Sequence, residues 1–214
     1  MNPVEMKDNV LLADIGNTYF HVYDGAKVEH LLYEDAIGRY QDKVLYYISV
    51  NHHLDPQIEK IALWKNISSC FSIEGEYETM GVDRKALCLS QDSGVFVDAG
   101  SAITVDVVEK GVYKGGFILP GLKAYVDSYK SISSALDITL NKELKLSRLP
   151  TTTKDGISYG IIASIKALID QQREGKALYF TGGDGKFLSS FFEEVIYDEM
   201  LVFNGMKQAI KNKG

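Results

Sequence analysis

The feature that most constrains the fold is a pattern that occurs twice, in "VLLADIGNTYFHVYDG" (10–25) and in "GVFVDAGSAITVDVVEKG" (94–111). Each copy has an apolar strand, then Asp-x-Gly, a small hydroxyl or amide side chain, a nearby Thr, and a second strand that ends near Gly. The two aspartates, Asp14 and Asp98, are 84 residues apart (98 − 14). Internal repetition predicts two related half-domains, and a chance resemblance between two hairpins is the alternative.

The residue types in these hairpins are suited to a nucleotide phosphate. Glycine allows a sharp turn and a close approach of the backbone to a ligand. Backbone N–H groups and hydroxyls in such a turn can bind phosphate oxygens. An aspartate repels phosphate directly, but it can hold a magnesium ion that bridges to phosphate. The pattern therefore predicts a metal–polyphosphate site, whereas a single copy would more often be an ordinary Asp-Gly turn than a functional site.

A third turn, "YFTGGDG" (179–185), follows another apolar strand and precedes a helix. Gly182 and Gly183 leave room there for a flat base or a phosphate. The P-loop, the G-x-G-x-x-G fingerprint and the G-x-S-x-G elbow do not occur in the sequence. The four histidines have no metal-binding spacing, and His52-His53 is predicted to be an exposed loop pair.

Composition excludes several classes of protein. The net charge is −6 and the pI is near 5.3, which argues against nucleic-acid binding. No stretch approaches the roughly 18 apolar residues of a membrane span, and the N-terminus lacks the pattern of a signal peptide. We therefore expect a cytoplasmic protein without a membrane or nucleic-acid partner. Cys70 and Cys88 are expected to be reduced thiols.

Mixed strands and helices predict an α/β protein. Strands are expected at 10–14, 19–24, 27–34, 44–50, 69–73, 94–98, 103–109, 112–118, 177–181 and 199–203, from β-branched and aromatic content and flanking turn residues. Helices are expected at 56–65, 83–91, 121–135, 156–173, 185–195 and 205–212.

Several motifs of the chain resemble those of type III pantothenate kinases, over nearly its whole length. The matching segments, in the family's order, are 14–18 (DIGNT), 81–84 (GVDR), 98–104 (DAGSAIT), 115–122 (GGFILPGL) and 181–183 (TGG). The Gly-x-Asp-Arg and Gly-Gly-x-Ile-x-Pro-Gly-Leu elements are the more specific of these.

The resemblance implies an architecture and a reaction. The family has duplicated ribonuclease H-like halves of the actin/Hsp70/sugar kinase type, with mixed β-sheets flanked by helices. The expected halves are 1–92, with the first phosphate loop and the substrate motif, and 93–214, with the second phosphate loop and the Gly-Gly turn. The family transfers the γ-phosphoryl group of ATP to pantothenate, the first step towards coenzyme A.

The resemblance also implies roles for individual residues. Asp83 is expected to be the general base that accepts the proton of the pantothenate hydroxyl, and Arg84 to pair with the substrate carboxylate. The other expected substrate contacts are Tyr77, Gly81, Val82 and Thr153. The expected ATP contacts are Asp14, Ile15, Gly16, Asn17, Thr18, Tyr19, Phe20, His21, Ser101, Gly182 and Gly183. Asp98 is the expected ligand of a monovalent cation (K⁺ or NH₄⁺), and Asp14 is expected near Mg²⁺.

In this family the substrate site is completed across a dimer interface, so a homodimer is expected. Ser101 stands where the family usually has Thr, which keeps the hydroxyl and removes a methyl group. Two other functions stay open from the sequence. One is a nucleotide-binding regulatory or accessory protein without a small-molecule acceptor, and the other is a kinase of a different small acceptor, such as a sugar or acetate.

Overall fold

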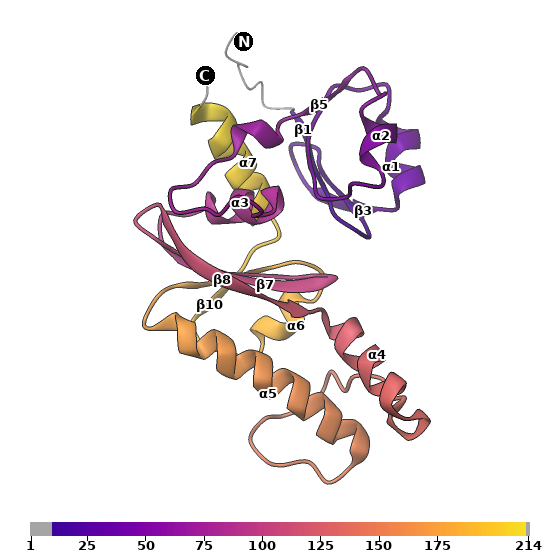
Figure 1. Cartoon of the computed structure of the whole chain (residues 1–214), viewed down its shortest axis with the longest axis vertical. Coiled ribbons are helices and arrows are strands. Elements are labelled where there is room, and N and C mark those ends of the chain that lie inside the picture. The colour runs from indigo at the N-terminus through magenta and orange to yellow at the C-terminus, as the bar shows by residue number, and fades with distance from the viewer. Residues whose placement is uncertain (1–9, 213–214) are drawn as a thin grey trace. The chain divides into compact units, whose positions relative to one another are not determined.

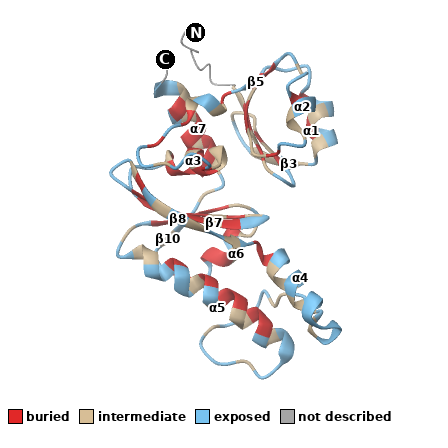
Figure 2. Cartoon of the chain, in the orientation of Figure 1, coloured by how far each residue is buried: buried red, intermediate tan, exposed pale blue. Residues whose placement is uncertain are grey.

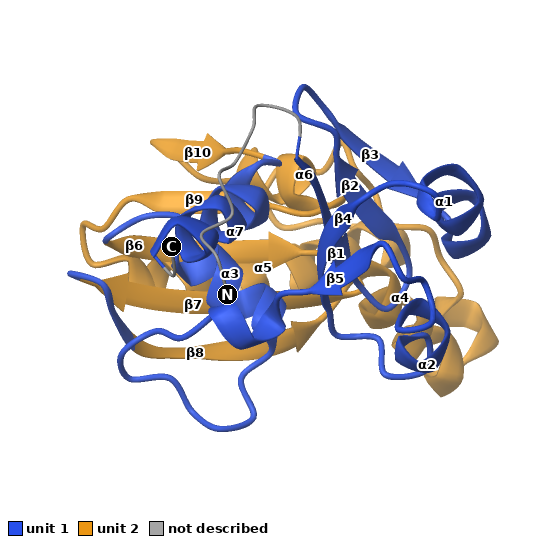
Figure 3. Ribbon diagram, turned by 90° about the horizontal axis from the view of Figure 1, so that it is seen from above, with its two compact units in different colours: residues 1–92, 110–113, 199–214 blue, residues 93–109, 114–198 orange. Residues whose placement is uncertain are grey.

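The computed structural model describes residues 10–212, which form two compact units (Figure 3). Of the described residues, the first unit contains 10–92, 110–113 and 199–212, and the second contains 93–109 and 114–198. The expected division after residue 92 assigned the C-terminal segment to the second half, whereas here helix α7 (Leu201–Asn212) belongs to the first unit. Within residues 10–212, no helix is long and apolar enough to cross a membrane.

The first unit is built on a five-stranded sheet in the order β3-β2-β1-β4-β5 (Figure 1). Its strands are β1 (Leu11–Ile15), β2 (Phe20–Tyr23), β3 (Val28–Leu31), β4 (Leu45–Ser49) and β5 (Trp64–Asn66). The helices of this unit are α1 (Tyr33–Tyr40), α2 (Asp55–Ile58), η1 (Ser68–Cys70), α3 (Val82–Cys88) and α7.

The second sheet has the order β10-β9-β6-β7-β8. Its strands are β6 (Gly94–Ala99), β7 (Ala102–Glu109), β8 (Val112–Pro120), β9 (Leu178–Thr181) and β10 (Val195–Tyr197). The accompanying helices are α4 (Leu122–Ile132), η2 (Ser134–Leu136), α5 (Thr153–Arg173) and α6 (Gly185–Ser189).

The two sheets repeat one topology. In each, the first two strands form an antiparallel hairpin, and the first strand also pairs in parallel with the fourth, so β1, β2 and β4 correspond to β6, β7 and β9. The fourth and fifth strands are parallel in both sheets. Asp14 and Asp98 are each the penultimate residue of the central strand. The prediction of duplicated α/β halves with mixed sheets is confirmed, and the repetition is not a chance resemblance.

Each sheet packs one face against an apolar cluster. Figure 2 colours the buried residues of both units red. In the first unit, alternate residues of β1, among them Ala13 and Ile15, pack with Ala36 and Tyr40 of α1. In the second unit, Val95 and Val97 of β6 and their neighbours pack against the buried face of α5. Because side chains alternate along a strand, the two aspartates point to the opposite face of their sheets.

Four expected elements differ from the structure because short apolar runs fit either a strand or a helix. The predicted helix 56–65 is wrong, since α2 ends at Ile58 and Trp64 begins β5 beside β4. The strand predicted at 69–73 is replaced by η1. The strand predicted at 199–203 is the start of α7, in which Leu201 to Phe203 are buried. The strand predicted at 27–34 ends at Leu31, and α1 follows it.

Three further elements differ in length or were not expected. The helix predicted at 185–195 is only α6, five residues long, and the unexpected edge strand β10 follows it. Helix α5 begins three residues earlier than predicted, at Thr153, because Thr152 acts as its N-cap.

Candidate functional site

The first hairpin loop connects β1 to β2 through Gly16 to Tyr19. The backbone N–H of Gly16 donates to the carbonyl of Tyr19 over 3.1 Å, which closes the turn. Asn17, Thr18 and Tyr19 are exposed, whereas Ile15 and Phe20 on either side are fully buried. The loop is therefore held at both ends by the core, and Ile15 and Phe20 can reach a ligand only through their backbone.

Asp14 and His21 face each other across this hairpin, as partners in the β1–β2 register. They lie on the face of the sheet that carries α7, where the ring of Tyr23 contacts that of Phe203 at 5.8 Å. The Nδ1 atoms of His21 and His30 are 2.6 Å apart, so one ring donates a hydrogen bond to the other. Burial, with the repulsion of His30 as a smaller cause, lowers the pKa of His21 to about 4, which makes its imidazole neutral at pH 7.

The second hairpin loop is shorter, with Gly100 and Ser101 between β6 and β7. The N–H of Gly100 donates to the carbonyl of Ala102 over 2.9 Å, and the N–H of Gly121 donates to the carbonyl of Ser101 over 3.2 Å. A Cβ atom at Gly121 would lie 2.5 Å from each of the carbonyl oxygens of Gly100 and Ser101. Only glycine fits this contact, so the end of the Gly-Gly-x-Ile-x-Pro-Gly-Leu element forms one wall of the second loop.

The Gly-Gly turn after β9 packs against the same strand end. Gly182 has a left-handed φ of +86°, and a Cβ atom there would collide with the Asp98 carboxylate and lie 2.6 Å from the Ala99 carbonyl oxygen. The N–H of Asp184 donates to that carbonyl over 2.9 Å. The structure thus brings Asp98, Gly182 and the exposed Gly183 together within the second unit, at the strand end that leads into Ser101.

Asp98 lies in a row of oxygen-bearing side chains. Its neighbours in register are Thr104 on β7 and Thr181 on β9, which share its face of the sheet. The hydroxyl oxygen of Thr104 is buried and accepts or donates no hydrogen bond among residues 10–212. A carboxylate with two flanking hydroxyls is the kind of donor set that hard cations prefer.

The Gly-x-Asp-Arg motif forms the start of α3, with Gly81 as the N-cap and Val82 half-buried as the first helical residue. The Asp83 carboxylate folds back over Gly81 and accepts a hydrogen bond from the backbone N–H of Arg84 over 2.8 Å. A side chain at residue 81 would collide with it. The glycine of the motif is therefore explained by the space that the Asp83 carboxylate requires.

Arg84 is buried, with 5% of its surface exposed. Its guanidinium donates hydrogen bonds to the hydroxyls of Tyr77 and Tyr113, the latter over 3.2 Å, and it stacks near the Tyr77 ring. A buried guanidinium needs such partners to offset its lost hydration. Tyr113 was not expected at this site, since its contact joins residues 29 positions apart in the sequence and no motif marks it.

The segment before the motif is fixed to α3 by an ion pair. Lys85 Nζ lies 3.0 Å from Glu76 Oε1, and Glu76 also accepts the backbone N–H of Ile73 over 2.9 Å. These two contacts hold the chain in place directly before Tyr77, whose side chain is 41% exposed. Tyr77 and Arg84, predicted as substrate contacts, are thus brought together.

Thr153 is exposed at the first residue of α5. The hydroxyl of Thr152 accepts the N–H of Asp155 over 3.2 Å, and Asn141 donates to the Asp155 carboxylate over 2.8 Å. Hydrogen bonding of the Asp155 carboxylate by the Asn141 side chain, and to a smaller extent by the Thr152 side chain, lowers the pKa of Asp155. The predicted contact residue therefore lies on a capped helix end that is tied to the 137–152 loop.

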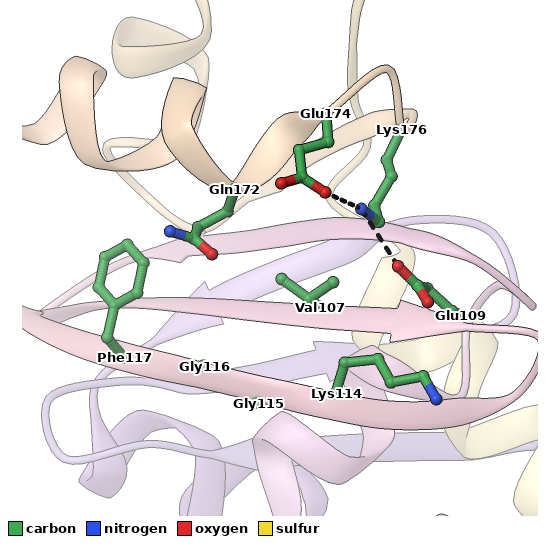
Figure 4. A pocket seen from close by; sticks show the side chains of 9 residues that line it. All are labelled: Val107, Glu109, Lys114, Gly115, Gly116, Phe117, Gln172, Glu174 and Lys176. Carbon is green, nitrogen blue, oxygen red and sulfur yellow. Dashed lines mark hydrogen bonds and ion pairs between the residues drawn. The ribbon is translucent and has the colours of Figure 1, made fainter.

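A hollow of about 320 Å³ lies elsewhere in the second unit (Figure 4). It is lined by the Gly115-Gly116 part of β8 and by the end of α5, and Lys176 there pairs with Glu109 (3.1 Å) and Glu174 (3.4 Å). β7 runs from Ala102 to Glu109, so the hollow lies at the end of the strand away from Ser101, about 23 Å along it. It contains none of the predicted site residues.

The predicted residues are distributed over both units. The first unit contains the loop from Asp14 to His21 and the group of Tyr77 and Gly81 to Arg84, and the second contains Asp98, Ser101, Thr153, Gly182 and Gly183. The chemistry available is a pair of glycine-containing hairpin loops, a row of cation-type oxygens, and a carboxylate beside an ordered guanidinium.

Comparison with known proteins places the chain among kinases. Residues 63–174, more than half of the chain, match the family model described as type III pantothenate kinase. The type III pantothenate kinase of Campylobacter hominis is 40% identical over 207 residues, which cover 96% of this chain and all of the relative. That of Wolinella succinogenes is 42% identical over 203 residues, covering 94% of this chain and 97% of the relative.

Solved structures agree on the fold. A Campylobacter jejuni protein described as a conserved putative Baf family transcriptional activator is 38% identical, with a TM-score of 0.86 over 95% of this chain and 98% of that one. A putative 2-dehydro-3-deoxygalactonokinase from Sinorhizobium meliloti is only 9% identical, but superposes with a TM-score of 0.57 over 95% of this chain and 99% of that one. The second likeness shows that this fold is shared by chains with very different sequences.

Proposed function

Because the chain belongs to the type III pantothenate kinase family, we propose that it phosphorylates pantothenate with ATP to give 4′-phosphopantothenate, the first step of coenzyme A biosynthesis. The observation that carries the proposal is similarity over the whole chain, together with the Gly81–Arg84 motif ordered at the start of α3. The alignment with the Campylobacter hominis relative covers 96% of this chain and all of that relative.

In this reaction Asp83 accepts the proton of the pantothenate hydroxyl as that oxygen attacks the γ-phosphorus. Arg84 pairs with the pantothenate carboxylate, and the Tyr77 and Tyr113 hydroxyls keep its guanidinium fork in one orientation. Gly81, Val82 and Thr153 are the other proposed pantothenate contacts. Phosphoryl transfer needs little covalent help from the protein, so the rest of catalysis is alignment and charge neutralisation.

The proposed ATP contacts are the two hairpin loops and the Gly-Gly turn. Asp14 to His21 contact the ATP phosphates, and Ser101, Gly182 and Gly183 contact ATP from the second unit. Since the pKa of His21 is about 4, its ring contributes a hydrogen bond and no charge at neutral pH. This supports a loop that binds phosphate chiefly through backbone N–H groups.

Two cations belong to the proposed site. Asp14 is the protein ligand of Mg²⁺, which neutralises the charge of the phosphates when bound, and one carboxylate suits an ion that keeps several waters and substrate oxygens. Asp98, flanked by the Thr104 and Thr181 hydroxyls, holds a monovalent cation, K⁺ or NH₄⁺. The buried hydroxyl of Thr104, which has no hydrogen bond within residues 10–212, fits this donor set.

We propose further that the protein acts as a homodimer in the cytoplasm, with a partner copy completing the acceptor site. Sedimentation velocity at assay concentration tests the dimer, and a monomer with full activity would exclude it.

The test of the proposed reaction is wild-type enzyme against Asp83→Asn. The asparagine oxygen can still accept the Arg84 N–H, so the fold is kept while the base is removed. We expect kcat to fall by roughly 10²- to 10⁴-fold with little change in the KM for ATP. The exposed neighbour change Glu78→Gln is the matched control and should be silent. Wild-type turnover in Asp83→Asn would exclude the assigned base.

The alternatives give different results with the wild-type protein. A regulatory protein, the description attached to the similar Campylobacter jejuni structure, would bind ATP but would form no phosphorylated product from pantothenate. The net charge of −6 gives no support for DNA as its ligand. A kinase of another acceptor would leave pantothenate unchanged and use a sugar or acetate in a substrate panel.

A further inference from the structure

The carbonyl oxygen of Gly16, in the first hairpin loop, accepts hydrogen bonds from two side chains that come from elsewhere in the first unit. The Tyr33 hydroxyl donates to it over 2.9 Å, and the Asn51 side-chain amide donates to it over 3.3 Å. Asn51 also donates to the Tyr33 hydroxyl over 3.1 Å, which closes a three-membered network. The contacts span 17 and 35 positions of sequence.

Both donors are themselves fixed. Asn51 is only 6% exposed, and its side-chain oxygen accepts the backbone N–H groups of His53 and Leu54, so its amide nitrogen must point towards Gly16. Tyr33 is the first residue of α1, and its ring packs edge-on against Phe20 at 5.7 Å. Burial raises the pKa of Tyr33, so its hydroxyl stays protonated and remains a donor.

Holding this carbonyl determines the direction of the next amide. The described chain contains no cis peptide bond, and in a trans peptide the N–H of residue 17 points opposite to the carbonyl of residue 16. With the Gly16 carbonyl turned inward to Tyr33 and Asn51, the Asn17 N–H is directed away from them. Gly16 would otherwise allow this peptide to rotate with little steric cost.

We propose that Tyr33 and Asn51 are positioning residues that lock the Gly16–Asn17 peptide, with its N–H preset to donate to a nucleotide phosphate. The inference rests on the proposed function for the location of the phosphates. A peptide that is already oriented loses no conformational entropy when the phosphate binds, so the affinity for the phosphate is higher.

The second hairpin is held differently. There the strand end is tied by a backbone N–H, that of Asp184 to the carbonyl of Ala99, and by the close contact of Gly182. In the first unit the corresponding backbone bond, from Val50 to Ile15, is present at 3.1 Å, and the side-chain lock on Gly16 is additional. The first hairpin loop, residues 16–19, is also longer than the second, residues 100–101.

The test compares affinity for an ATP analogue with affinity for adenosine, which lacks phosphates. In Tyr33→Phe the ring is kept and the hydroxyl is lost, so we expect the affinity for the magnesium complex of a non-hydrolysable ATP analogue to fall about tenfold. The affinity for adenosine, measured by competition, should not change. Asn51→Asp keeps the acceptor for residues 53 and 54 but removes the donor, and should act in the same direction.

Tyr40→Phe is the matched control. It removes a tyrosine hydroxyl from the other end of α1, where the partner is Glu29, and should leave both affinities at the wild-type value. If Tyr33→Phe lowered the affinities for adenosine and for the ATP analogue equally, or lowered neither, the proposed positioning role would be refuted.

Pantothenate turnover by the wild-type protein separates the two proposals. A wild type that binds the analogue without phosphorylating pantothenate refutes the proposed function, while the variant comparison still decides the lock. A wild type that binds no nucleotide refutes both.

Discussion

Replacing His21 with phenylalanine should flatten the pH dependence of stability of the first unit. The pKa of His21 is about 4 in the folded protein against 6.5 for the free side chain. Between these values the unfolded chain binds a proton that the folded chain does not, so stability falls as the pH is lowered. Above pH 6.5 the folded and unfolded states are both neutral at this group, and its contribution to the pH dependence ends.

The magnitude follows from the size of the shift. At pH 5 the histidine is protonated in the unfolded chain and largely neutral in the folded protein. This pH lies about 1.5 units below the unfolded pKa, so the free energy of unfolding is about 2 kcal/mol lower than at pH 7.5. Phe keeps an aromatic ring in the half-buried position but has no proton to bind. We therefore expect wild type to lose about 2 kcal/mol more than His21→Phe between these two pH values.

The assay is urea unfolding followed by tryptophan fluorescence. Trp64 is the single tryptophan of the sequence, and it is buried in the first unit with its indole N–H donating to the Tyr40 carbonyl over 3.0 Å. It therefore reports on the sheet that contains His21. His53→Gln, at an exposed histidine, is the control and should follow wild type. Parallel pH profiles for wild type and His21→Phe would refute the reasoning.

Three further predictions concern glycines. Gly205→Ala should destabilise the first unit by about 2–4 kcal/mol, because a methyl group there overlaps the Ala86 backbone where α3 and α7 pack. Gly38→Ala, on an exposed face of α1 with no atom within 4 Å of the new methyl group, should stabilise the same unit by roughly 0.5–1 kcal/mol; thermal melts compare the two, and similar shifts would contradict the packing argument. Gly182→Ala should weaken ATP binding and lower kcat at least tenfold, because the new methyl group would collide with the Asp98 carboxylate. Gly183→Ala, where the methyl group meets no atom within 4 Å, should fold normally. If circular dichroism showed that both variants lose the same stability, the close contact at Gly182 would not be the cause.

Much of the fold could be predicted because its signals are local. The hairpins around Asp14 and Asp98, the strand after residue 177 and the long helix α5 all follow from apolar alternation, turn residues and a cap. The errors fall where a short apolar run is compatible with either secondary structure. Leu201 to Phe203 resemble a buried strand, but they form the first turn of α7 because its packing partner is α3, more than a hundred residues away.

The candidate site divides in the same way. Asp83 and Arg84 lie within four consecutive residues that resemble the family's Gly-x-Asp-Arg motif, and the structure places both in the first turn of α3. Tyr113 beside Arg84, and Asn51 beside Gly16, have no local signature. Their roles depend on contacts that the folded chain makes over 29 and 35 positions, and neither carries a motif that a sequence pattern could identify.

The residues by themselves predicted the duplication and the two acidic hairpins, because turn geometry and strand alternation are encoded in neighbouring residues. The role of the Gly81–Arg84 motif was predicted from its resemblance to the family. Only the tertiary structure decided which backbone carbonyls and carboxylates are fixed by contacts with distant residues, and which residues make those contacts. Hydrogen bonds such as Tyr33 to Gly16, and close contacts such as Gly182 to Asp98, form between segments that are brought together when the sheets assemble.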